Sequence, residues 1–109
     1  MSDAEPLTGS IVCGGRVTGE VRVLTDPRDS VSVQPGEILV VPCSHPEYAI
    51  GVLQAAGLIC ETGGIISHIC TVALELGIPC LTEVKHATTL LSTGARVSLD
   101  ADLGVVHAV

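Results

Sequence analysis

The chain has 109 residues, 12 acidic and 5 basic, with a formal net charge of −7 and 47% hydrophobic residues. This length and hydrophobic content predict one globular domain over residues 1–109 and exclude a disordered chain. The acidic balance, without any basic run, excludes nucleic acid and anionic membrane surfaces as expected partners.

The N-terminal half is predicted to be rich in β-strands. Residues 11–24 should form one long bent strand or a hairpin, because polar and apolar residues partly alternate there and glycines interrupt them. A polar loop is expected over residues 25–30. Residues 37–42 contain four consecutive aliphatic residues, a run that is typical of a strand buried on both faces.

A helix is predicted from Pro46 to Ala56. Ser44 and Glu47 have the spacing of a capping box, and a proline occupies the first turn. Gly57 would end this helix, because glycine readily adopts the left-handed conformation found after helices. Leu58 to Cys60 is then expected to be a short buried strand.

The second half is predicted to alternate strands and helices. A glycine turn, Gly63-Gly64, leads to a helix that has Ser67 as its N-cap and that Gly77 ends. The remaining expected elements are a strand over residues 79–83, a short helix over residues 85–91, and a hairpin of residues 96–99 and 105–108. The fold class is therefore α/β, with a β-α-β unit in the second half.

The cysteines and the chain start bear on the cellular compartment. Five cysteines, without any Cys-x-x-Cys pair, exclude a disulfide or zinc framework, and we expect reduced thiols that pack as small hydrophobic groups. Residues 50–60, the longest nearly apolar stretch, are too few to span a bilayer. The first six residues do not resemble a signal peptide. We expect a cytoplasmic protein, with residues 1–8 as a flexible leader.

The β-α-β unit carries the strongest candidate site. Its crossover should place the glycine turn at the carboxyl edge of the sheet, where such sheets bind ligands. Gly63 and Gly64 permit close backbone approach, and the first amides of the following helix lack internal partners, so we expect an anion pocket. His68 lies in the first helical turn, where the helix dipole disfavours a cationic imidazole by about 0.3 to 1 kcal/mol. This arrangement suits a histidine that accepts and returns a phosphoryl group, although a histidine that caps its helix fits it as well.

The sequence around His68 resembles a known family. The run ETGGIISH at residues 61–68, followed by ELGIP at residues 75–79, is similar to the signature of the phosphohistidine swivelling domain. This is the mobile domain of PEP-utilising enzymes such as pyruvate phosphate dikinase, phosphoenolpyruvate synthase and enzyme I of the sugar phosphotransferase system. The resemblance covers nearly the whole chain and implies a swivelling β/β/α fold.

The resemblance also implies a function. His68 would be phosphorylated at one active site and would deliver the group at a second site after the domain rotates. A separate ATP-grasp protein or domain, with ATP and Mg²⁺, would supply the group, or phosphoenolpyruvate would be the donor, and another protein or domain would bind the acceptor. The chain itself has no nucleotide-binding loop and no carboxylate cluster for a metal, so we expect it to bind no cofactor and to be inactive alone. It would be the phosphoryl carrier of a split, dikinase-like phosphotransferase.

Several neighbours of His68 are candidate supporting residues. The hydroxyl or amide of Ser67 is expected to contact the phosphate in addition to capping the helix. Thr62 and Glu61 either orient the imidazole and bind the phosphate, or form a turn and a solvated edge. The predicted phosphate-binding or supporting set is Thr62, Gly63, Gly64 and Ser67.

Two positions depart from the family pattern. Leu74 stands where the family usually has arginine, which removes a cation near the phosphate. Ile66 stands where plant and bacterial dikinases have a regulatory threonine, so control by phosphorylation at that position is not expected. Other basic residues are candidate substitutes for the missing cation: Arg16, Lys85 and Arg96.

Two alternative functions follow from the residues. The first, suggested by Leu74, is a non-catalytic docking or regulatory module that kept the fold and lost phosphoryl transfer. The second is a thiol or metal function built on Cys43, Cys60 or Cys70 together with His68.

Overall fold

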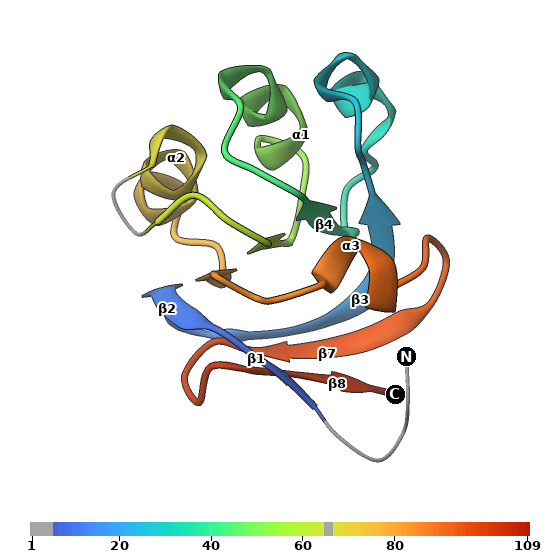
Figure 1. Ribbon diagram of the computed structural model, residues 1–109, viewed down its shortest axis with the longest axis vertical. Coiled ribbons are helices and arrows are strands. Elements are labelled where there is room, and N and C mark those ends of the chain that lie inside the picture. Colours follow the sequence, from blue (N-terminus) through green and yellow to red (C-terminus); the bar gives the residue numbers. More distant parts are fainter. Residues whose placement is uncertain (1–5, 65–66) are drawn as a thin grey trace.

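The protein is a small mixed α/β domain, and its computed structural model describes residues 6–64 and 67–109. Eight strands form one sheet in the order β1-β8-β7-β3-β4-β5-β6-β2 (Figure 1). The strands are β1 (Leu7–Thr8), β2 (Ser10–Cys13), β3 (Arg16–Val23), β4 (Ile38–Val41), β5 (Gly57–Cys60), β6 (Cys80–Thr82), β7 (Arg96–Asp100) and β8 (Val105–Ala108). The helices are η1 (Pro27–Ser32), η2 (Pro46–Tyr48), α1 (Ala49–Val52), α2 (His68–Leu76) and α3 (Ala87–Leu90), of which η1 and η2 are 3₁₀-helices.

The centre of the sheet is parallel, and its strands β4, β5 and β6 are completely buried. Strands β3, β4, β5 and β6 run parallel to one another, whereas the pairs formed by β1, β2, β7 and β8 are antiparallel. All four residues of β4 are buried, which confirms the predicted two-sided strand. Its side chains alternate between two hydrophobic clusters, because successive residues of a strand point to opposite faces.

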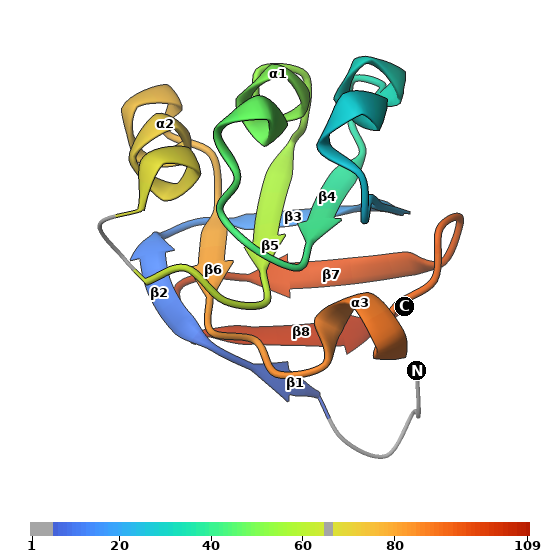
Figure 2. The same ribbon diagram turned by 45° about the horizontal axis from the view of Figure 1, so that its top comes forward.

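The helices divide the domain into layers. In Figure 2, α2, α1 and η1 lie side by side over β6, β5 and β4. The cluster on this face includes Leu39, Leu58 and Ile69, and the cluster on the opposite face includes Ile38, Ile59 and Ala87 from α3. The helical layer therefore rests on one face of the parallel strands, and α3 packs with the antiparallel strands on the other.

The sheet is nearly closed. Strands β1 and β2 stand at the two ends of the strand order, yet only Gly9 separates them in sequence. A Cβ atom at Gly9 would clash with a methyl carbon of Val84 and would lie 2.7 Å from the carbonyl oxygen of Thr82. Glycine is required here because the chain passes too close to the end of β6 for any side chain.

Some predicted elements differ from the structure. Residues 11–24 do not form a hairpin, because β2 pairs with β6 while β3 pairs with β4 and β7. The loop expected over residues 25–30 contains most of η1. Residues 1–5 of the expected leader lie outside the described residues, and Leu7 and Thr8 pair with β8.

The helix predicted from Pro46 to Ala56 is shorter than expected. It consists of η2 followed by α1, which ends at Val52, and its N-cap is His45, whose Nδ1 accepts from the amide of Glu47. Gly57 is not a helix terminator but the first residue of β5, where a Cβ atom would lie 2.9 Å from Leu99. A tertiary packing requirement, which has no local sequence signal, explains this glycine.

The other predicted helices and strands agree more closely. The hairpin of β7 and β8 is confirmed, and α2 ends as predicted at Gly77, which is left-handed with φ 73°. Among the residues described, no helix has both the length and the apolar character needed to cross a membrane.

Candidate functional site

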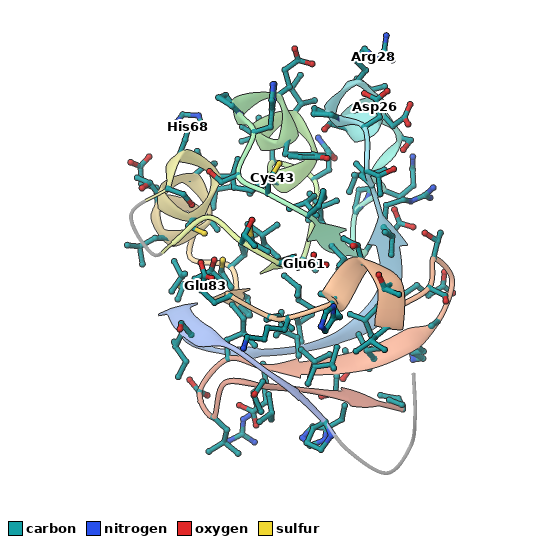
Figure 3. All side chains as sticks on the ribbon, in the orientation of Figure 1. Asp26, Arg28, Cys43, Glu61, His68 and Glu83 are labelled. Carbon is teal, nitrogen blue, oxygen red and sulfur yellow. The ribbon has the colours of Figure 1, made fainter. Side chains whose placement is uncertain are left out.

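His68 is the first residue of α2, in the crossover between the parallel strands β5 and β6. Ile69, Cys70 and Ala73 are the buried residues of this helix, whereas His68 is exposed. Figure 3 shows the imidazole on the outer side of α2, pointing away from the sheet. Because an α-helix has 3.6 residues per turn, Glu75, two turns later, lies on the same exposed side. A second macromolecule can therefore reach the ring of His68.

The amides of the glycine turn bind a carboxylate of the same chain. Gly63 and Gly64 both have positive φ, 147° and 75°, and their N–H groups donate to Oε1 of Glu83 at 3.2 and 2.9 Å. In Figure 3, Glu83 lies near the end of β6, on the far side of α2 from His68. These two amides therefore already have an acceptor within the chain. Phosphate binding by these amides stays a prediction.

The residues before the glycines fasten the turn to its surroundings. The hydroxyl of Thr62 donates to the carbonyl oxygen of Pro42 at 3.0 Å, and the thiol of Cys60 donates to the carbonyl oxygen of Thr62 at 2.7 Å. Glu61 accepts from both the amide and the hydroxyl of Thr88, and these bonds lower the pKa of its carboxyl group. Thr62 and Glu61 therefore form structural contacts, and Figure 3 shows Glu61 apart from His68, whereas phosphate binding by Thr62 stays a prediction.

Ser67 occupies the N-cap position of α2 but its hydroxyl does not cap the helix. Its backbone is extended, with φ −68° and ψ 158°, and its buried Oγ bonds to no oxygen or nitrogen of the described residues; its polar neighbour is the thiol of Cys70. A Cβ atom at Gly63 would lie 3.4 Å from that Oγ, so the serine packs beneath the glycine turn. The structure places Ser67 next to His68 and the turn, whereas a contact between its hydroxyl and a phosphate would require a different rotamer.

Three buried thiols lie under α2. Cys60, Cys70 and Cys80 are completely buried and belong to the core cluster of the helical layer. A hydrogen bond to Cys70, together with burial, raises the pKa of Cys60 and of Cys80, whereas the same neighbours lower the pKa of Cys70. The sulfur of Cys70 is inaccessible and His68 is exposed, so the two do not form a nucleophilic pair.

The described part of the chain contains no group of three or more His, Cys, Asp or Glu residues that could hold a metal ion. Cys43, which the thiol hypothesis included, is exposed and lies apart from His68 in Figure 3. Asp100 and Asp102 belong to the turn between β7 and β8, where Oδ1 of Asp100 accepts from the amides of Asp102 and Leu103 at 3.1 Å.

Leu74 is 53% exposed, and α2 contains no basic residue. The five basic residues are on other elements: Arg16 and Arg22 on β3, Arg28 in η1, Lys85 after β6 and Arg96 on β7. Three of them pair with carboxylates: Arg16 with Asp100 and Asp102, Arg22 with Glu37, and Arg28 with Asp26. Ile66, the other departure from the family pattern, lies outside the described residues.

Glu83 is the site residue that the sequence reasoning missed. A signal was present, because Glu83 directly follows an apolar strand and the expected parallel pairing brings that strand end beside the glycine turn. A carboxylate at this edge is the natural partner for amides that have no internal acceptor.

Comparison with known proteins places these features in a family. The profile described as "PEP-utilising enzyme, mobile domain" matches residues 33–104. An uncharacterized protein of Mycobacterium tuberculosis is 39% identical over 109 residues, which are 100% of this chain and 13% of the relative. Phosphoenolpyruvate synthase of Pyrococcus furiosus is 37% identical over 89 residues, 82% of this chain and 11% of the synthase.

A solved structure supports the fold. Aconitase X of Thermococcus kodakaraensis has a chain that superposes with a TM-score of 0.72 at 23% identity, covering 97% of this chain and 99% of that one. This likeness concerns the fold alone. Because the profile covers more than half of the chain, the protein belongs to the family of mobile domains of PEP-utilising enzymes.

Proposed function

We propose that the chain is a phosphoryl carrier and that His68 is the residue that carries the group. The observation behind this proposal is the exposed imidazole at the first position of α2, in a member of the mobile-domain family. An imidazole nitrogen would form a bond to phosphorus while the bond between phosphorus and the donor oxygen breaks, and the ring would release its other proton to water. In the second transfer the acceptor oxygen would form a bond to phosphorus while the phosphorus–nitrogen bond breaks, and the ring would regain a proton from water so that neutral imidazole leaves.

The position of His68 explains why the proposal includes a second protein or domain. The ring is exposed on the outer side of α2, so it can enter the active site of a larger partner (Figure 3). The chain spans about an eighth of the length of the M. tuberculosis relative, and that share leaves room there for other domains. We propose an ATP-grasp partner that uses ATP and Mg²⁺, or a donor site for phosphoenolpyruvate, together with an acceptor-binding partner.

The charges around α2 indicate what that partner must supply. A phosphoryl group adds about two negative charges at neutral pH. Since α2 has no basic residue and Arg28, the cation of the helical layer, pairs with Asp26 at 2.7 Å, the partner is proposed to bring the lysine or arginine that binds the group. Position 74 is six residues after His68, about 9 Å along the helix axis, so its side chain does not adjoin the ring. The leucine there is no reason to infer loss of transfer.

The test is intact mass spectrometry after incubation with source-cell extract plus ATP, or plus phosphoenolpyruvate. We expect the wild type to gain the mass of one phosphoryl group with one of the two donors. The gain should survive at alkaline pH and disappear at acidic pH, as a phosphoramidate does. It should be absent from His68→Ala and present in His107→Ala, a matched variant of another exposed histidine.

Extract that phosphorylates a known swivelling domain is the positive control. If the wild type gains no mass with either donor in that extract, the carrier function is wrong. If His68→Ala still gains an acid-labile phosphoryl group, the function stands but another residue carries the group.

A further inference from the structure

The glycine turn is arranged as an anion-binding site that the protein itself fills. Two consecutive N–H groups converge on one oxygen of Glu83, at 3.2 and 2.9 Å. Successive amides with this convergence form a concave site that attracts anions, and helix N-termini attract them for the same reason. The carboxylate of Glu83 therefore takes the place that an external phosphate or carboxylate would occupy.

The backbone of Glu83 is strained in order to make this contact. Its φ is 57°, in the left-handed region that residues with a Cβ atom rarely adopt. The residues on either side, Thr82 and Val84, are completely buried, so the chain must turn sharply at Glu83 while both neighbours stay in the core. Such outliers persist where the surrounding structure or a function requires them. Here the unusual backbone directs the carboxylate at the turn.

The glycine turn also determines where α2 begins. Below it, Gly63 packs against Ser44 and Ser67, where a Cβ atom would lie 2.8 Å from the Cβ of Ser44. Above it, Glu83 holds the two amides. Only three residues lie between Gly64 and His68 in the sequence, so the position of the turn restricts the position of the first helical residue.

We propose that Glu83 is a positioning residue for His68. Its carboxylate is an internal anion that fixes the Gly63–Gly64 turn and prevents free phosphate from binding to these two amides. The phosphoryl group on His68 is then bound by the partner's cations instead. Occupation of the two amides by Glu83 follows from the contacts alone, whereas the effect of Glu83 on phosphoryl transfer rests on the proposed carrier function.

The first test uses inorganic phosphate and ¹⁵N-labelled protein at neutral pH. Addition of phosphate to the wild type should leave the Gly63 and Gly64 amide resonances unchanged. In Glu83→Ala, the same addition should produce saturable shifts at these two amides. Glu83→Gly should behave like Glu83→Ala. Because glycine readily adopts the left-handed backbone at this position, this variant shows that the response does not come from a folding defect. Glu20→Ala, which removes another exposed carboxylate, should behave like the wild type.

The second test is the rate at which His68 gains a phosphoryl group in active extract. We expect Glu83→Ala to lower this rate by roughly tenfold or more, because small misplacements of a reacting group are costly. Glu83→Gln keeps an acceptor oxygen for the two amides, and a neutral acceptor retains roughly half the strength of the hydrogen bonds. We therefore expect its phosphorylation rate to stay within about threefold of the wild-type rate. This rescue would not occur if only the fold were disturbed.

The outcomes separate the two proposals. If the glycine amides respond to phosphate equally in the wild type and in both variants, or in none of them, Glu83 does not occupy the anion site. If Glu83→Ala is phosphorylated at the wild-type rate, Glu83 does not position His68. If the wild type is not phosphorylated at all, the carrier function fails, and the phosphate titration still decides whether Glu83 fills the turn.

Discussion

Replacement of Ser67 by alanine should not destabilise the protein, although serine before a helix normally does stabilise it. Loss of a hydrogen-bonded N-cap costs about 1 kcal/mol. The Oγ of Ser67, however, is buried, and among the described residues it bonds to no oxygen or nitrogen and does not cap the first turn of α2; its polar neighbour is the thiol of Cys70, a weak hydrogen-bonding partner. A buried hydroxyl without a partner costs about 1 to 3 kcal/mol, so its removal should be neutral or stabilising by up to about 1 kcal/mol.

Thermal unfolding followed by circular dichroism measures this difference. For a chain of this length 1 kcal/mol corresponds to about 4 °C in Tm, so we expect the Tm of Ser67→Ala to stay the same or rise by up to about 4 °C. Asp26→Ala is the positive control, because the Asp26 side chain does cap η1 by accepting from the amide of Arg28 at 2.9 Å. A fall in Tm of about 4 °C or more for Ser67→Ala would show that its hydroxyl is hydrogen-bonded in solution, and would refute the reasoning.

Three further predictions follow from packing and charge. Gly57→Ala should lower the free energy of unfolding by about 1 to 3 kcal/mol, measured by urea denaturation, because the new methyl group would lie 2.9 to 3.0 Å from side chains of β7 and β3; an unchanged midpoint would contradict this. Burial raises the pKa of Glu37, but the hydrogen bonds from Arg22 and a backbone amide outweigh it and leave the pKa lowered. Glu37→Gln should therefore lower the free energy of unfolding by about 2 kcal/mol at pH 7. The difference in Tm between this variant and the wild type should shrink as the pH falls below about 4.3, the ordinary pKa of glutamate. A Tm difference that stays constant with pH would exclude the ion pair as its cause. Leu74→Arg should change the phosphorylation rate of His68 by less than about threefold, because position 74 lies about 1.7 turns, or about 9 Å, farther along the helix and about 120° around it from His68; a tenfold rise would show that the cation belongs on α2.

The sequence predicted the features that depend on local patterns. The aliphatic run of β4, the end of α2 at Gly77 and the hairpin of β7 and β8 follow from hydrophobic periodicity and glycine conformation, and the structure contains them. The position of His68 at the start of α2 was predicted in the same way, from the glycine turn and the helix stop.

Features that depend on distant contacts were not predictable. Gly57 has the local sequence context of a helix terminator. Glycine is needed there, however, because side chains of β3 and β7 leave no room for a Cβ atom. The glycine turn was expected to let a ligand approach closely, but the amides of Gly63 and Gly64 are bound by Glu83, which lies some twenty residues later in the chain. Local patterns therefore located the histidine, whereas the partners of the turn depended on how β5 and β6 pair.

The position of Gly9 between the two ends of the sheet has a consequence for how the domain opens. An ordinary open sheet has two edge strands that can detach independently, and detached edges are exposed to pairing with other chains. Here the two end strands, β1 and β2, are consecutive in the chain, so movement of one away from β8 pulls the other away from β6. Backbone amides of both strands should then exchange their hydrogens with solvent in one cooperative event, and the barrel-like sheet has no separate weak edge.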